Sequence, residues 1–181
     1  MTLAACDATH AWLHVPRMAL LDGLGADARA FDDLTDAQNQ AIVDGLMLVA
    51  LADGPATDGQ ATVLAGLIAE LPTMAARSEH DREAYARASL RRLEALAGIE
   101  GVAAYVAALA DALPSQTVRA VLLVMGASLG RGDGAPSPGQ QHILGMMAET
   151  FGVDDAAFTD AVERLAAGVL PPPLERVAPR P

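Results

Sequence analysis

Two stretches of the chain, 80 residues apart, carry the same residues in the same order. The identical pairs are Asp53/Asp133, Gly54/Gly134, Gly59/Gly139, Gln60/Gln140 and Leu64/Leu144, and the conservative pairs are Thr57/Ser137, Val63/Ile143, Leu67/Met147 and Leu71/Phe151. Matches this dense in a single frame indicate an internal duplication. We therefore expect two equivalent helical hairpins, residues 36–71 and 115–151, related by an approximate twofold axis.

Each repeat also contains a helix-start signal. A Thr or Ser followed three residues later by Gln forms a capping box, in which the two side chains satisfy free backbone N–H groups at a helix N-terminus. Thr57 and Ser137 begin such boxes, and Thr35 begins another one before the first repeat. Apolar residues recur at helical spacing after each box, which indicates amphipathic helices.

The composition favours the same fold class. Hydrophobic residues make up 52% of the chain but aromatic residues only 3%, so Ala, Leu, Val and Met must fill the core, and Ala and Leu favour helices. We predict an all-α, compact bundle of about seven helices over residues 36–168. The apolar segment after Ser115 should be its central helix. Residues 1–35 should form an irregular arm with one short helix over 16–24, and residues 169–181 a Pro-rich, extended tail.

The charge and residue content exclude several classes of function. The chain has a formal net charge of −11, and all 12 of its basic residues are Arg. So acidic a chain is unsuited to binding along the phosphates of nucleic acid. The absence of Lys excludes Schiff-base chemistry, and the sequence has no phosphate-binding glycine loop and no nucleophile elbow. We therefore expect a protein that is not an enzyme, binds no nucleic acid and has a protein partner.

The sequence predicts a cytoplasmic protein. Its longest apolar stretch, residues 118–130, is shorter than the roughly 20 residues needed to span a bilayer. Cys6 is the only cysteine, so no disulfide forms within the chain. The sequence Leu3-Ala4-Ala5-Cys6 matches the cleavage box of a bacterial lipoprotein, but the residues before Cys6 are too few for the apolar stretch of such a signal.

The candidate metal ligands are aspartates of the repeat. Asp53 and Asp133 occupy the same loop position, and Asp58 follows in the first loop only. Two interpretations are open: the carboxylates stabilise tight interhelical turns, or they bind a divalent cation. A calcium loop needs more oxygen ligands than these loops supply, so the turn interpretation is favoured. The only cofactor that the sequence suggests is a weakly bound divalent cation.

The remaining candidate ligands are four histidines and one aspartate. Asp7, His10 and His14 share a helical face at a spacing compatible with metal binding. Zn²⁺ requires further ligands, so exposed histidines on the arm are favoured. His80 is expected at the surface, and His142 is expected to be partly buried beside an apolar stripe.

Two further patterns concern helix surfaces. The mixed charges of one predicted helix favour a solvent-exposed face over an anion-binding patch; they are Arg82, Glu83, Arg87, Arg91, Arg92 and Glu94. Glycines also fall inside predicted helices, where each costs up to ~1 kcal/mol relative to Ala; they are Gly45, Gly66, Gly126 and Gly145. Either close approach between helices or a narrow apolar groove would explain these glycines.

The doubled unit of helix, Asp-Gly loop, Ser/Thr cap and helix resembles the TerB family of tellurite-resistance proteins, a fold family that includes the N-terminal domain of a DnaJ-like co-chaperone. The resemblance is carried by residues 52–57 (Ala-Asp-Gly-Pro-Ala-Thr) and 132–137 (Gly-Asp-Gly-Ala-Pro-Ser). It implies a compact all-α fold without enzymatic activity. It also implies roles in stress response, in metal association through acidic residues, and in scaffolding at a membrane-bound complex.

Both loops depart from the family pattern. Positions that are often acidic in the family hold Pro55 and Ala135, and the usual Glu after the cap is replaced by Gln60 and Gln140. Each replacement removes a potential metal ligand. The leading hypothesis is a TerB-like accessory protein in stress or tellurite resistance, acting as a scaffold or weak metal-associating module. The alternative is an adaptor or co-chaperone-like module without metal that uses an apolar helical groove.

Overall fold

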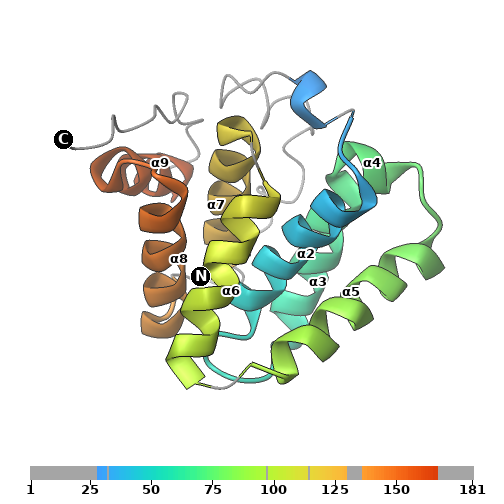
Figure 1. The fold of residues 1–181 in the computed structure, drawn as a ribbon, viewed down its shortest axis with the longest axis horizontal. Helices are drawn as coiled ribbons and strands as arrows, with labels where there is room; N and C mark the ends of the chain where they lie inside the picture. Colours follow the sequence, from blue (N-terminus) through green and yellow to red (C-terminus); the bar gives the residue numbers. More distant parts are fainter. Residues whose placement is uncertain (1–27, 32, 97, 114, 130–135, 167–181) are drawn as a thin grey trace, which may run out of the picture.

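The computed structural model of the chain describes residues 28–31, 33–96, 98–113, 115–129 and 136–166 (Figure 1). Within these ranges the protein is all-α and compact, as predicted, and contains no β-strand. Its elements are η2 (Ala28–Phe31, a 3₁₀-helix), α2 (Asp36–Ala50), α3 (Asp58–Glu70), α4 (Pro72–Ala75), α5 (Glu79–Glu94), α6 (Gly98–Ala112), α7 (Gln116–Leu129), α8 (Pro138–Phe151) and α9 (Asp155–Ala166). The short helix α4 was not expected. It forms because Pro72 occupies a first-turn position, where proline is preorganised for a helix.

Helices α2 and α7 form the centre of the bundle (Figure 1). Helix α2 packs against α3, α5, α6, α7 and α8, while α7 also contacts α3, α8, α9 and η2. As predicted, α7 is buried nearly all round. The prediction that the helix after the Thr35 box is amphipathic is wrong for α2, because every residue from Ala41 to Ala50 is buried, including Asp44. Helix α2 is therefore the core helix around which the other helices are arranged.

Two of the in-helix glycines allow α2 and α7 to approach closely. A Cβ atom on Gly45 would lie 2.8 Å from Cδ2 of Leu122, and one on Gly126 would lie 3.3 Å from Cγ2 of Val49. Close approach thus explains Gly45 and Gly126. At Gly66 and Gly145 an added Cβ would meet nothing within 4 Å, so close approach does not explain those two positions.

All three predicted capping boxes are present. The hydroxyl oxygens of Thr35, Thr57 and Ser137 accept hydrogen bonds from the backbone N–H of Gln38, Gln60 and Gln140, at 3.3, 3.2 and 3.1 Å. Each Gln side chain accepts the backbone N–H of its cap residue in return. Local chemistry between residues i and i+3 therefore begins α2, α3 and α8 where the sequence predicted.

Removing either repeat cap should destabilise the fold. We expect Thr57→Ala to lower the free energy of unfolding by about 0.5–2 kcal/mol, the usual cost of losing an N-cap. Ser137→Ala should cost more than Thr57→Ala, because the Ser137 hydroxyl also donates to the carboxylate of Asp53 on another element. Urea denaturation measures both changes, and unchanged midpoints in both variants would contradict the capping role.

The core extends into the segment that precedes α2. Phe31 of η2 is only 1% exposed and belongs to the main hydrophobic cluster, and η2 packs on α7. The predicted short helix over 16–24, the candidate ligands Asp7, His10 and His14, and the Pro-rich tail all lie outside the described residues.

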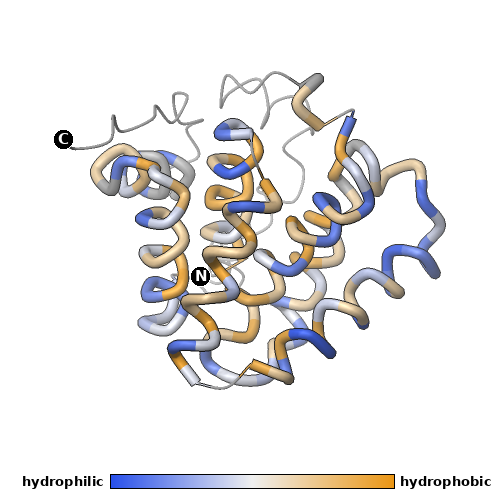
Figure 2. The backbone as a smooth tube through the Cα atoms, in the orientation of Figure 1, coloured by the Kyte–Doolittle hydropathy of each residue, from blue (hydrophilic) through white to orange (hydrophobic). Residues whose placement is uncertain are grey.

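Hydropathy follows the packing. Figure 2 shows hydrophobic residues concentrated along α7 and hydrophilic ones at many positions of α5. The described helices include no candidate for a membrane-spanning segment. Helix α5 is the most peripheral of the long helices that contact α2, and Ser89 is its only buried residue.

Candidate functional site

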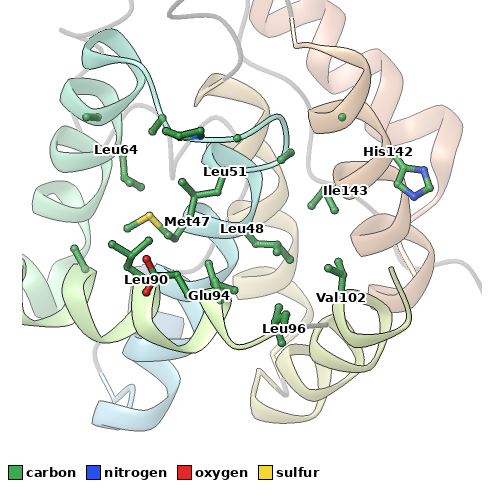
Figure 3. A pocket seen from close by; sticks show the side chains of 18 of the residues that line it. Met47, Leu48, Leu51, Leu64, Leu90, Glu94, Leu96, Val102, His142 and Ile143 are labelled. Carbon is green, nitrogen blue, oxygen red and sulfur yellow. The ribbon is translucent and has the colours of Figure 1, made fainter. Parts of the chain in front are cut away.

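An open groove of about 950 Å³ lies between α3, α5, α6 and α8, with the C-terminal half of α2 as its floor (Figure 3). Met47, Leu48 and Leu51 supply the floor, and side chains of the four surrounding helices supply the walls. Several wall positions are alanines or glycines, namely Ala61, Ala65, Ala86, Gly98 and Gly139. Because these residues are small, they do not fill the space between the helices that surround α2. A groove therefore forms here.

The groove is almost entirely apolar. Of the residues that line it, only Glu94 and His142 have polar side chains. Leu90 and Ile99 also line it, and their exposed fractions of 38% and 56% make them the exposed large hydrophobic residues of the described structure. The prediction that His142 is partly buried is wrong, because this residue is exposed at the groove. His80 is exposed on α5, as predicted.

A buried polar network joins α2, α5 and α6, three of the helices that form the groove. Asp44 of α2 is 5% exposed, and its carboxylate accepts hydrogen bonds from Arg92 and Ser89 of α5 and from Tyr105 of α6. The Arg92 Nε–Asp44 Oδ2 distance is 3.0 Å. The side-chain amide of Gln40 adds donors to Ser89 Oγ at 2.8 Å and to Asp44 Oδ1 at 3.1 Å. One carboxylate thus joins three helices.

The network shifts the pKa values of its members. Burial alone would raise the pKa of Asp44, but the hydrogen bonds from Arg92, Ser89 and Tyr105 outweigh burial and hold that pKa below its ordinary value. Burial, followed by the hydrogen bond to Asp44, raises the pKa of Tyr105 to about 12. At neutral pH the network therefore consists of an ionised carboxylate, a guanidinium and a neutral phenol.

This network positions two walls of the groove. Ser89 and Arg92 alternate along α5 with the lining residues Leu90 and Leu93, and Tyr105 lies one helical turn after Val102 on α6. The bonds to Asp44 therefore fix α5 and α6 relative to the groove floor. Helix α5 depends strongly on these bonds, because it buries little apolar surface of its own.

The expectation that all the charged residues of α5 form one solvent-exposed face is corrected at two positions. Arg92 is not a free surface residue but the ionic partner of Asp44, and the Arg82 guanidinium donates to the backbone carbonyl of Arg77 at 2.9 Å. Glu83, Arg87, Arg91 and Glu94 are exposed, as expected. Asp44 itself was missed, although a single carboxylate within the apolar run 41–50 was a signal that it needed a partner.

Acid should weaken this network. The pKa of Asp44 is lower in the folded protein than in the unfolded chain, so its contribution is complete above the unfolded value and is lost as the pH falls through the folded value. We expect wild type to lose more stability than Asp44→Asn when the pH is lowered from 7 to about 3. Urea denaturation at both values measures the difference. Asp111→Asn, an exposed substitution on α6, should keep the pH dependence of wild type, and equal losses in wild type and Asp44→Asn would contradict the prediction.

The candidate metal ligands occupy different environments. The carboxylate of Asp53 accepts the Ser137 hydroxyl at the start of α8, whereas Asp58 is exposed in the first turn of α3. Asp133 lies outside the described residues. Among the residues that the structure describes, no three of His, Cys, Asp and Glu are grouped so as to hold a metal ion. The clear role of Asp53 is to join the loop after α2 to the N-terminus of α8.

In comparisons with known proteins, no family model, no curated protein and no solved structure matches this chain.

Proposed function

We propose that this protein is a non-catalytic protein-interaction module whose apolar groove binds a helix of a partner protein. The exposure of Leu90 and Ile99 at the groove carries this proposal. Exposed apolar surface gathered at one concave site costs free energy in the isolated protein and commonly marks a binding site. The alternative that the sequence left open, an adaptor with an apolar groove, is the function that the geometry supports best.

The chemistry of the lining supports a binding role rather than catalysis. Glu94 and His142 are the polar side chains on the groove surface. Acid–base and nucleophilic catalysis need a nucleophile, a base and an orienting group held within hydrogen-bond reach of each other. The lining supplies neither a Ser nor a Cys nucleophile beside these two residues.

The same lining favours a helix over an extended peptide. Every backbone N–H and C=O that loses water must find a partner, and a surface with only two polar side chains offers few. An α-helix satisfies its own backbone and presents an apolar stripe at positions i, i+3, i+4 and i+7, which is how helices bind in grooves. Because the groove is open, the outer face of such a helix would stay in water.

The TerB-like relationship remains part of the proposal, together with the duplication of residues 36–71 and 115–151. Matching capping boxes at Thr57 and Ser137 support it. In this proposal, the scaffold role that the TerB resemblance implies is carried out through the groove. The proposed function needs no cation at Asp53, whose carboxylate accepts the Ser137 hydroxyl.

The proposal is tested with a labelled helical peptide of about 14 residues, roughly 21 Å long, that has a Leu stripe and Gln at its other positions. Fluorescence anisotropy should show saturable binding to wild type. Leu90→Glu and Ile99→Glu should each weaken binding at least about tenfold, because a charge would be buried without a partner.

Matched controls place the same charge elsewhere on the same helices. Ala84→Glu on α5 and Ala104→Glu on α6 change exposed residues that do not line the groove, and both should bind as wild type does. Absence of binding to wild type, or equal weakening by the control variants, would contradict the proposed function.

A further inference from the structure

We propose that the natural partner helix carries basic residues beside its apolar stripe; this inference rests on the proposed function of the groove. It comes from the distribution of charge on the elements that form the groove. Two acidic residues lie at the α5–α6 side, where Glu94 lines the groove and Glu100 is the neighbour of the lining residue Ile99. On the opposite side, Asp53 separates the lining residues Ala52 and Gly54.

Basic charge is scarce around the same groove. Helices α3, α6 and α8 contain no Arg or Lys. The arginines of α5 are mostly engaged: Arg92 pairs with Asp44, and Arg87 pairs with Glu83 at 3.1 Å. The guanidinium of Arg82 is bonded to backbone carbonyls. Arg91 remains on α5 as an exposed cation for which the described structure contains no salt bridge.

The net charge of the whole protein has the same negative sign as the acidic residues around the groove. The net charge of −11 attracts a basic partner and repels an acidic one, which raises the association rate of the former. Exposed charge pairs contribute little individually and are screened by salt. The preference for a basic helix should therefore be moderate, about three- to tenfold at low salt for a few such pairs.

The test compares three helical peptides that share one Leu stripe and differ only at the flanking positions, which are Arg, Gln or Glu. At about 0.05 M salt, we expect the Arg-flanked peptide to bind most tightly and the Glu-flanked peptide least tightly. At about 0.5 M salt, the differences in affinity should shrink because salt screens the charges. Equal affinities for the Arg and Gln peptides at low salt would overturn the inference, as would tighter binding of a labelled fatty acid than of any peptide.

Variants that remove acidic side chains test whether the preference for the Arg peptide comes from the residues at the groove. Glu94→Gln combined with Glu100→Gln should remove most of the advantage of the Arg peptide without weakening the Gln peptide. Glu149→Gln combined with Glu163→Gln removes the same charge from exposed positions outside the groove and should leave the advantage largely intact. Equal effects of the two double variants would assign the preference to net charge alone and overturn the placement at the groove.

The two proposals fail in different ways. If the Gln peptide binds and Leu90→Glu abolishes its binding, but Arg flanks add nothing, the groove function stands and the basic partner is wrong. If no peptide binds wild type, the proposed function itself is wrong.

Discussion

Arg92→Met is expected to lower the free energy of unfolding by about 3 kcal/mol. The substitution keeps the apolar length of the side chain but leaves the buried carboxylate of Asp44 without its cation. Removing one partner of a buried ion pair typically costs about 3–5 kcal/mol. The side chain of Arg92 is itself 39% exposed, and Asp44 would keep its bonds from Ser89 and Tyr105, so the lower end of that range applies.

The neighbouring residue provides the control for this prediction. Arg91→Met removes the same charge from an exposed position of the same helix, and surface substitutions of this kind stay within about 0.5 kcal/mol of wild type. Urea denaturation of both variants measures the contrast. Equal stabilities of Arg92→Met and Arg91→Met would show that the network does not hold α5 on α2.

Gly139→Ala and Gly145→Ala should change stability in opposite directions, although both lie in α8. A Cβ on Gly139 would lie 3.0 Å from the carbonyl oxygen of Ala52 and would clash with the Asp53 carboxylate, whereas one on Gly145 meets nothing within 4 Å. Overpacking costs about 1–3 kcal/mol, and Ala gains up to ~1 kcal/mol over Gly within a helix. We expect Gly139→Ala to lose about 1–2 kcal/mol and Gly145→Ala to gain about 0.5–1 kcal/mol, both read from urea denaturation. A gain in both variants would contradict the tight contact between the Asp53 loop and α8.

A Gly-to-Ala substitution at the equivalent position of the first repeat tests the proposed duplication. Gly59 is the repeat equivalent of Gly139. If the two hairpins are equivalent, Gly59→Ala should also destabilise the protein, although Gly66→Ala on the same helix, where an added Cβ has open space, should not. A stabilising Gly59→Ala would indicate that the likeness of the two loops ends at their capping boxes.

The features that the sequence predicted are those set by neighbouring residues. Thr35, Thr57 and Ser137 cap helices through contacts over three residues, so their pattern is visible in the chain itself. The central position of α7 was also predictable, because a helix that is apolar nearly all round must be surrounded by others. Gly152 ends α8 in a left-handed conformation, which glycine adopts without strain because it has no Cβ atom.

The features that the sequence did not predict depend on contacts between distant segments. Ser89, Arg92 and Tyr105 lie 45 to 61 residues from Asp44, and nothing in the local pattern of α5 distinguishes Arg92 from Arg91. The groove likewise results from small residues on several helices, so no single helix indicates it. Asp53 was recognised as a loop residue of the repeat, but its contact with Ser137 required the fold to bring the two together.

The isoleucine methyl groups test the central claim most directly. The chain contains four isoleucines, of which Ile68, Ile99 and Ile143 line the groove, whereas Ile42 is buried in α2 away from it. Titration of isoleucine-methyl-labelled protein with the Arg-flanked Leu-stripe peptide should shift the δ1-methyl signals of the three lining residues and leave that of Ile42 in place. A saturable shift confined to Ile42, or no shift of the three lining signals at a peptide concentration that saturates anisotropy, would contradict binding in the groove.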